Sequence, residues 1–175
     1  MVKVKVILKG EKAKLPIYSS KGAAGCDIFS TEDVTIMPDE IVGMRYERSG
    51  YRGGGLVECS ITHPQVTKHV IKRHPVTVDT GLILELPFET ELELRGRSGL
   101  AFNHEIQPFN GTIDEDFRST LSVKIWNLGT QPYVIKAGDK IAQGVIKSII
   151  RAEFEEVEEL SDTERGTGGF GHTGR

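Results

Sequence analysis

The stretch VTVDTGLILELPFETELELRGR, residues 76–97, decides the fold class of this chain. It holds two short runs, 76–87 and 89–97, which are rich in β-branched and leucine side chains and are bounded by glycine and proline. The second run alternates apolar and charged residues, which is the two-residue period of a half-buried strand. Residues 76–97 therefore predict two consecutive β-strands.

Similar short runs occur along most of the sequence, whereas no long window has a convincing helical stripe. They are VKVKVILKG at 2–10, VTIMP at 34–38, GLVECSIT at 55–62, STLSVKIWNLG at 119–129 and IAQGVIKSII at 141–150. Many short strands separated by turn residues predict an all-β, jelly-roll-like sandwich or barrel. Helix is expected only as one or two turns after Ser98. At 175 residues with 38% hydrophobic content, we expect a single domain over residues 1–175.

Composition limits the function classes. The formal net charge of -3 argues against a protein that coats nucleic acid, because gripping many phosphates requires a basic excess. Two cysteines are too few for a disulfide scaffold and fit a reducing compartment. No apolar run has the length of a membrane span, and the N-terminus lacks the apolar core of a signal peptide. The expectation is a cytoplasmic protein without membrane contact.

Residues 44–76 form an insertion-like basic segment in this acidic protein. The interpretation from the residues is either a hairpin-like excursion, with YRGGG as its turn, or a basic surface for a protein or nucleic-acid partner. Zinc binding is disfavoured because the spacings of its histidines and cysteine match no zinc signature. The basic residues are Arg45, Arg48, Arg52, Lys68, Lys72 and Arg73, and the candidate zinc ligands are Cys59, His63, His69 and His74.

The C-terminal part consists of an acidic arm, 153–164, and a glycine-rich segment, RGTGGFGHTGR, at 165–175. Ordering so much glycine costs conformational entropy, so the segment is expected to be flexible or to order on a ligand. Arg165 suits phosphate, and Phe170 offers a flat face for a base. An extended arm of fifteen residues reaches about 50 Å, which is enough to act on another subunit.

Five short motifs appear in order along the chain. They are AAGCDI at 23–28, GRSGLA at 96–101, NGTIDEDFR at 110–118, GDKIAQ at 138–143 and RGTGGFG at 165–171. Together they resemble the five motifs of the trimeric deoxyuridine triphosphate nucleotidohydrolases, the dUTPases. The resemblance implies a jelly-roll-like homotrimer with active sites shared between subunits. It also implies Mg²⁺-dependent hydrolysis of dUTP to dUMP and pyrophosphate.

The resemblance also implies roles for individual residues. Asp114 matches the aspartate that activates the water attacking the α-phosphorus. Asp27 matches the aspartate that contacts magnesium through metal-bound water. Phe117 stands where the family commonly has a tyrosine stacked against the deoxyribose. The substrate-binding set implied by the motifs is Arg97, Ser98, Gly99, Asn110, Gly111, Ile113, Phe117, Gln143, Arg165, Gly169 and Phe170.

Two alternative functions stay open at this level. A dCTP deaminase shares the fold and nucleotide class, although RSGLA and the glycine-rich lid are similar to the hydrolase pattern. A nucleotide-gated binding or signalling module would use the basic segment at 44–76 for an unidentified partner, and it is compatible with hydrolysis.

Overall fold

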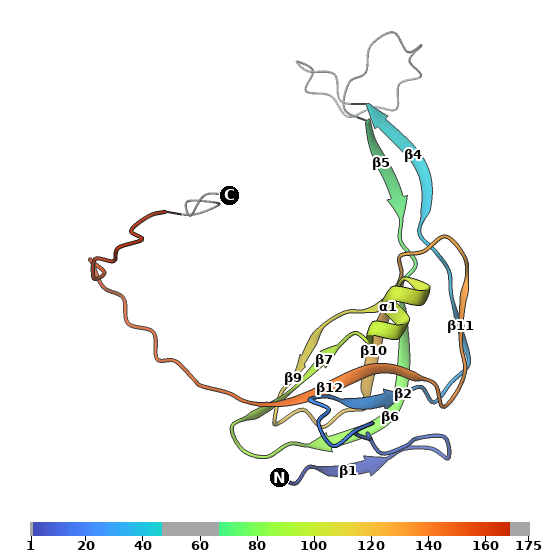
Figure 1. Ribbon diagram of the computed structural model, residues 1–175, viewed down its shortest axis with the longest axis horizontal. Helices are drawn as coiled ribbons and strands as arrows, with labels where there is room; N and C mark the ends of the chain where they lie inside the picture. The colour runs from blue at the N-terminus through green and yellow to red at the C-terminus, as the bar shows by residue number, and fades with distance from the viewer. Residues whose placement is uncertain (1, 47–66, 169–175) are drawn as a thin grey trace.

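The computed structural model describes residues 2–46 and 67–168, which form twelve β-strands and one short α-helix (Figure 1). The first sheet has the order β1 (Lys5–Leu8), β6 (Val76–Glu85), β10 (Leu121–Asn127), β8 (Ile106–Pro108). The second has the order β2 (Cys26–Phe29), β12 (Lys140–Ser148), β7 (Thr90–Arg95), β9 (Gly111–Ile113). Two-stranded sheets pair β3 (Val34–Ile36) with β11 (Tyr133–Ile135) and β4 (Glu40–Tyr46) with β5 (Thr67–Lys72). Every pairing in these sheets is antiparallel.

The core lies between the two four-stranded sheets. Alternate residues of β10, namely Leu121, Val123 and Ile125, are buried, while the residues between them face outward. The same alternation buries Leu92 and Leu94 of β7. These side chains belong to one hydrophobic cluster that draws on both sheets. The prediction of an all-β, jelly-roll-like fold is confirmed.

The single described helix, α1, runs from Ser98 to His104 and follows β7 after a two-residue link. Arg97 precedes it in extended conformation, and Glu105 ends it with a φ of 56° in the left-handed region. Leu100 anchors the helix in the core. The expectation of one or two helical turns after Ser98 is confirmed, and the helix start fixes the place of Arg97.

The hairpin formed by β4 and β5 projects from one end of the body (Figure 1). Its strands pair from Glu40 with Lys72 to Tyr46 with Thr67. The insertion-like segment is therefore a hairpin at its two ends. Its bounds differ from the expected 44–76, because the pairing begins at residue 40 and Val76 already belongs to β6 of the first sheet. GLVECSIT and YRGGG lie outside the described residues.

The C-terminal arm leaves β12 and extends away from the sheets (Figure 1). Between residues 149 and 168 it has no strand or helix. Its large apolar side chains are exposed: Ile150 by 97%, Phe154 by 94% and Leu160 by 87%. Within the described ranges, no helix is long and apolar enough to cross a membrane.

Candidate active site

A buried carboxylate, Asp27, organises a cluster of polar side chains on the second sheet. Asp27 is 2% exposed and lies on β2. The Lys140 ammonium lies 2.7 Å from its Oδ2, and the Ser19 hydroxyl donates to the same oxygen at 2.5 Å. Arg97 donates from Nε to Oδ1 at 3.2 Å. We call Asp27, Ser19, Lys140, Arg97 and Gln143 the Asp27 cluster.

The sheet register brings Gln143 into this cluster. Gln143 on β12 pairs with Asp27 of β2 on one side and with Arg95 of β7 on the other. Its Nε2 lies 3.5 Å from Asp27 Oδ1. Because only two residues separate the end of β7 from the start of α1, Arg97 reaches back to the same carboxylate. Three separate sequence stretches, 23–28, 96–101 and 138–143, thus meet at one end of the second sheet.

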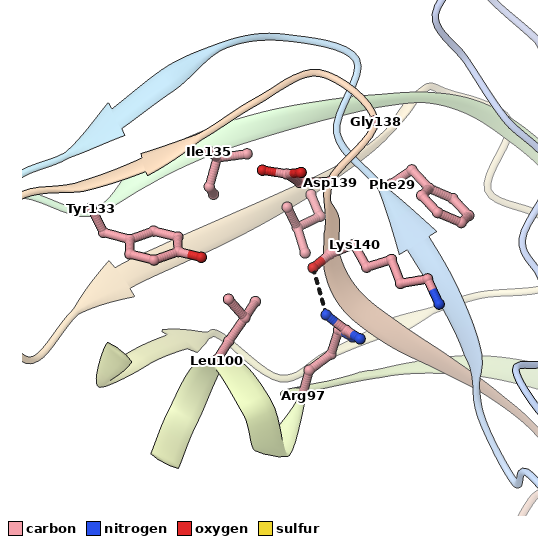
Figure 2. Close-up of a pocket in the computed structure, with 9 residues that line it drawn as sticks. Phe29, Arg97, Leu100, Tyr133, Ile135, Gly138, Asp139 and Lys140 are labelled. Atoms are coloured by element: carbon pink, nitrogen blue, oxygen red, sulfur yellow. Dashed lines mark hydrogen bonds between the residues drawn. The ribbon is translucent and has the colours of Figure 1, made fainter. Parts of the chain in front are cut away.

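Beside the cluster lies a cavity of about 340 Å³ (Figure 2). Arg97 and Leu100 of the helix side face Tyr133 and the 138–141 segment across it. The Arg97 side chain is held by a second bond, from Nη1 to the carbonyl oxygen of Lys140 at 3.0 Å. Burial raises the pKa of Tyr133, so its phenol remains neutral in this wall.

The Asp27 cluster carries an excess of positive charge, since two cations face one carboxylate. Burial by itself raises the pKa of Asp27. Hydrogen bonds from Lys140 and Ser19 and the charge of Arg97 outweigh that effect, so the pKa of Asp27 lies below its usual value. Asp27 remains ionised and holds both cations in place. Such a fixed, net cationic group suits an anion such as a polyphosphate.

Asp114 lies elsewhere in the same chain. It directly follows β9, whose Gly111 pairs with Leu94 and whose Ile113 pairs with Leu92. Leu94, the partner of Gly111, also pairs with Gly144 of β12, which is the residue next to Gln143. The Asp27 cluster is therefore at the Gly111 end of β9. Asp114 is therefore at the opposite end, where it lines a cavity of about 300 Å³. Within one chain the structure does not bring Asp114 and Asp27 together.

An ion pair fixes the loop that follows Asp114. Arg151 at the start of the arm donates from Nη2 to Glu115 Oε1 at 2.8 Å. This hydrogen bond holds the pKa of Glu115 below its usual range. The loop closes as a turn, in which the Phe117 N–H donates to the Asp114 carbonyl at 3.2 Å. Phe117 is 39% exposed, so its ring is a surface platform rather than a core side chain.

Comparison with known proteins identifies the family. The dUTPase family model matches residues 64–174. A deoxyuridine 5′-triphosphate nucleotidohydrolase of Nautilia profundicola is 38% identical over 99% of this chain and 100% of its own length. One of Clostridium kluyveri is 40% identical over 94% of this chain and 92% of its own. This chain belongs to the dUTPase family.

Solved dUTPases have the same fold. A variant of the Staphylococcus bacteriophage 80alpha dUTPase with dUpNHpp superposes with a TM-score of 0.76 at 23% identity, over the whole of both chains. A variant of the dUTPase from phage phi11 of S. aureus, described as showing the coordination of a structural Mg(II) ion, has a TM-score of 0.69 at 22% identity. It covers 92% of this chain and 100% of its own.

The dUTPase motifs occupy three places in this structure. The first, second and fourth motifs meet in the Asp27 cluster, with Ser98 and Gly99 exposed at the start of α1. The third forms β9 and the turn from Asp114 to Phe117 that follows it, with Ile113 half-buried at the end of the strand. Arg165 lies on the arm in a local turn, where its Nε donates to the Gly168 carbonyl at 2.8 Å. Gly169 and Phe170 lie outside the described residues.

Two members of the Asp27 cluster were missed by sequence reasoning. Lys140 lies inside GDKIAQ, three residues before Gln143, and a cation within one of the five motifs was a usable signal. Ser19 lies in no motif. It contacts both Asp27 and Lys140, whose ammonium is 2.9 Å from the serine hydroxyl. Only the folded positions of residues 19 and 27 reveal that role.

The described part of the chain contains no group of three or more histidine, cysteine or acidic residues arranged to hold a metal ion. Both oxygens of Asp27 already accept hydrogen bonds from Ser19 or from cations. A water-mediated contact of Asp27 with magnesium would compete with these contacts. The zinc alternative gains no support from His74, and Cys59 and His63 lie outside the described residues.

Proposed function

We propose that this dUTPase hydrolyses dUTP to dUMP and pyrophosphate, with water as the nucleophile at the α-phosphorus. The observation that carries the proposal is the Asp27 cluster, a prearranged cationic group assembled from three dUTPase motifs. The relatives from Nautilia profundicola and Clostridium kluyveri are both named deoxyuridine 5′-triphosphate nucleotidohydrolases, which favours hydrolysis over deamination of dCTP.

The triphosphate binds to the Asp27 cluster in this mechanism. Arg97 offers a guanidinium already oriented by Asp27 and by the Lys140 carbonyl, so little side-chain entropy is lost on binding. Gln143 adds a neutral donor, and the exposed Ser98 and Gly99 add contacts at the start of α1. Charge that spreads over the phosphates during the reaction is thereby neutralised by groups that need no reorganisation.

Asp114 acts as the general base on the attacking water. Its side chain is exposed at the edge of the second cavity, beside a loop fixed by Glu115 and Arg151. A positioned carboxylate of this kind contributes about 10²- to 10⁴-fold to the rate. The described structure offers no cysteine there, and we assign no covalent intermediate to the reaction.

A complete site requires more than one copy of the chain. Asp114 and Asp27 lie toward opposite ends of β9, yet both are needed at one α-phosphorus. We infer a homotrimer in which the Asp27 cluster of one subunit faces the third motif of another. The apolar side chains of the arm, Ile150, Phe154 and Leu160, are almost fully exposed in the single chain, and covering them against a neighbouring subunit would be favourable.

Selectivity for dUTP is assigned to the third motif. The exposed ring of Phe117 stacks against the deoxyribose and leaves no room for a ribose 2′-hydroxyl. Asn110 and the backbone of Gly111 and Ile113 read the uracil edge, and a larger or differently hydrogen-bonding base fits poorly there. Compared with the tyrosine that is common at this position in the family, phenylalanine lacks the hydroxyl but keeps the aromatic ring that this role requires.

The arm supplies the lid in this proposal. Its described part extends far from the sheets, with Arg165 exposed near its end (Figure 1). Arg165 then contacts the terminal phosphates of a neighbouring site, and Gly169 and Phe170 cover the base. The contacts that the closed arm makes with the substrate offset the conformational entropy that is lost when the glycines are ordered.

Magnesium enters as the metal–nucleotide complex. The donor set around Asp27 is cationic rather than rich in free carboxylates, so it fits phosphate oxygens better than a bare ion. Mg²⁺ prefers water and phosphate oxygens with few carboxylates, which a magnesium–dUTP substrate satisfies.

Pyrophosphate release from dUTP, dTTP, dCTP and UTP with magnesium tests the proposal. The intact chain is expected to hydrolyse dUTP alone. Asp114→Asn is expected to lose at least a hundredfold in kcat while retaining binding of α,β-imido-dUTP. Asp116→Asn, the same change two residues along, serves as the control and retains activity. Ammonia release from dCTP, or a folded chain inert toward dUTP, contradicts the proposal.

A further inference from the structure

The indole of Trp126 is the centre of a stack of side chains on the outer face of the first sheet. The Phe109 ring lies nearly parallel to it, with ring centroids 5.6 Å apart and planes 9° apart. The Arg73 guanidinium carbon lies 4.0 Å from the indole centroid. Lys124 Nζ lies 5.5 Å from the centroid of Phe109. We call these four residues the Trp126 stack.

One side of the stack is tied to the base of the β4–β5 hairpin. The indole N–H of Trp126 donates to Asp39 Oδ1 at 2.8 Å, and the backbone N–H of His74 donates to the same oxygen at 3.3 Å. Arg73 Nη1 lies 3.9 Å from Asp39 Oδ2. Asp39 directly precedes β4, and Arg73 directly follows β5. Both ends of the hairpin therefore converge on one indole.

The other side of the stack reaches the nucleotide site. Phe109 follows β8 in the first sheet, where its N–H donates to the Lys124 carbonyl at 2.8 Å. Two residues later, Gly111 begins β9 in the second sheet and pairs with Leu94. Residues 109 and 110 are thus the crossing between the sheets. Phe109 is 43% exposed, so contact with the indole, rather than burial in the core, fixes its ring.

We propose that Trp126 is a positioning residue of the nucleotide site. It holds Phe109, and through Phe109 it sets where Asn110 and Gly111 meet the uracil. Asp39 and Arg73 in turn hold the indole, so the base of the hairpin is linked mechanically to base recognition. This inference rests on the proposed function, because it assigns Asn110 and Gly111 to uracil binding.

The expected effect is on binding rather than on the chemical step. Aromatic and cation–π contacts of this kind are each worth a few-fold in an equilibrium constant. A displaced uracil contact weakens the ground state and the transition state equally, which raises KM and leaves kcat unchanged. We expect Phe109→Leu and Arg73→Ala each to raise the KM for dUTP by about 3- to 10-fold.

Matched variants separate positioning from general destabilisation. Phe109→Tyr keeps the aromatic face and is expected to retain the KM of the intact chain. Phe102→Leu makes the same aromatic-to-aliphatic change on an 87% exposed phenylalanine of α1 and is expected to leave KM unchanged. Lys5→Ala removes an exposed cation 2.6 Å from Glu85 and is the control for Arg73→Ala. Thermal unfolding of each variant shows which chains are folded.

The experiment combines steady-state hydrolysis of dUTP with calorimetric binding of α,β-imido-dUTP. A raised KM and Kd at unchanged kcat in Phe109→Leu and Arg73→Ala, with Phe109→Tyr unaffected, supports the inference. Unchanged KM and Kd in folded Phe109→Leu or Arg73→Ala overturn it, as does an equal loss of kcat. Failure of the proposed function is recognised separately, because the intact chain would then neither hydrolyse dUTP nor bind the analogue.

The same chain carries an internal probe for this link. Trp126 is the one tryptophan in the sequence, so tryptophan emission, excited selectively over the tyrosines, reports on the stack alone. Binding of α,β-imido-dUTP to the intact chain is expected to change that emission, and Arg73→Ala is expected to reduce the change. A change of the same size in folded Arg73→Ala contradicts the link between the hairpin base and the site.

Discussion

The carboxylate of Asp27 and the ammonium of Lys140 lie 2.7 Å apart, although 113 positions separate the two residues in the chain. Asp27 also orients Arg97, so one buried anion holds two cations that the proposed mechanism assigns to the triphosphate. The pairing has two consequences. The cations are in place before substrate arrives, and the stability of the fold depends on the ionisation of one aspartate.

Asp27→Asn is expected to lower stability by about 1–3 kcal/mol at neutral pH, because two partly buried cations lose their counter-charge. The pKa of Asp27 is lowered in the folded state, so its stabilisation is present above the unfolded pKa, about 4, and is lost as pH falls through the folded value. Urea unfolding of the intact chain and the variant between pH 7 and pH 2 measures the difference. The difference in the free energy of unfolding between the two proteins is expected to become smaller below about pH 4.

Exposed carboxylates provide the control for that titration. Glu85 also has a lowered pKa, caused by its hydrogen bond from Lys5, but this pair lies in solvent and is screened. Glu85→Gln is expected to leave the unfolding profile close to that of the intact chain. If Asp27→Asn and the intact chain differed by the same free energy of unfolding from pH 7 to pH 2, the proposed link between the ionisation of Asp27 and stability would be wrong.

Lys140→Gln is expected to raise the KM for dUTP by about 10-fold, because it removes one charge from the Asp27 cluster. The product dUMP has a single phosphate, so its inhibition constant is expected to change less. Comparing the KM for dUTP with the inhibition constant for dUMP checks the assignment. Equal changes in both constants would contradict a contact of Lys140 with the β- or γ-phosphate, because dUMP retains only the α-phosphate.

Much of this architecture could be predicted from the sequence, for reasons visible in single strands. β7 and β10 alternate buried and exposed residues, so the period of two was readable from 89–97 and 119–129. β2 was missed because all four of its residues are buried and no alternation exists. The three-residue strands β8, β9 and β11 are too short to show any period.

Only the site residues that lie within the short motifs could be predicted from the sequence. Short motifs placed Asp27, Arg97 and Gln143 in one function, and the sheet register explains why they meet. The role of Ser19 and the link from Arg73 through Trp126 to Phe109 depend on contacts between residues distant in sequence. No local pattern encodes such contacts, so they required the folded chain.

Phe117→Ala is expected to reduce the preference for dUTP over UTP by about 10-fold or more, because a cavity replaces the ring that we propose excludes a 2′-hydroxyl. Phe117→Tyr keeps the ring and is expected to retain the preference. The ratio of kcat/KM for dUTP and UTP measures the effect. Unaltered discrimination in folded Phe117→Ala would assign sugar selection to another residue.

Replacement of residues 47–66 by Asn-Gly is expected to leave dUTP hydrolysis intact. Tyr46 and Thr67 are paired in register, and a two-residue Asn-Gly turn suits an antiparallel hairpin. Asp39 and Arg73, which contact the Trp126 stack, are untouched. Steady-state kinetics of the shortened chain give the test. A strong loss of activity would place residues 47–66 in the enzyme function, whereas retained hydrolysis leaves them free for an unidentified partner.

Mixing two inactive variants tests the shared site directly. Asp114→Asn lacks the base but has an intact Asp27 cluster, and Arg97→Ala has the opposite defect. If each site takes these groups from different subunits, some sites in mixed trimers contain neither defect. Random mixing in equal amounts assembles a complete site in about one case in four. Joint refolding is therefore expected to restore about a quarter of the activity of the intact chain.

The control for this experiment is Arg97→Ala refolded with the double variant Arg97→Ala/Asp114→Asn. Every chain in that mixture has a defective Asp27 cluster, so no complete site can form and no activity is expected. Recovered activity in the first mixture alone requires Asp114 and Arg97 to act from different chains. The absence of any recovery in mixtures shown by sizing to be trimeric would instead require both groups from one chain, which the placement of Asp27 and Asp114 at opposite ends of β9 opposes.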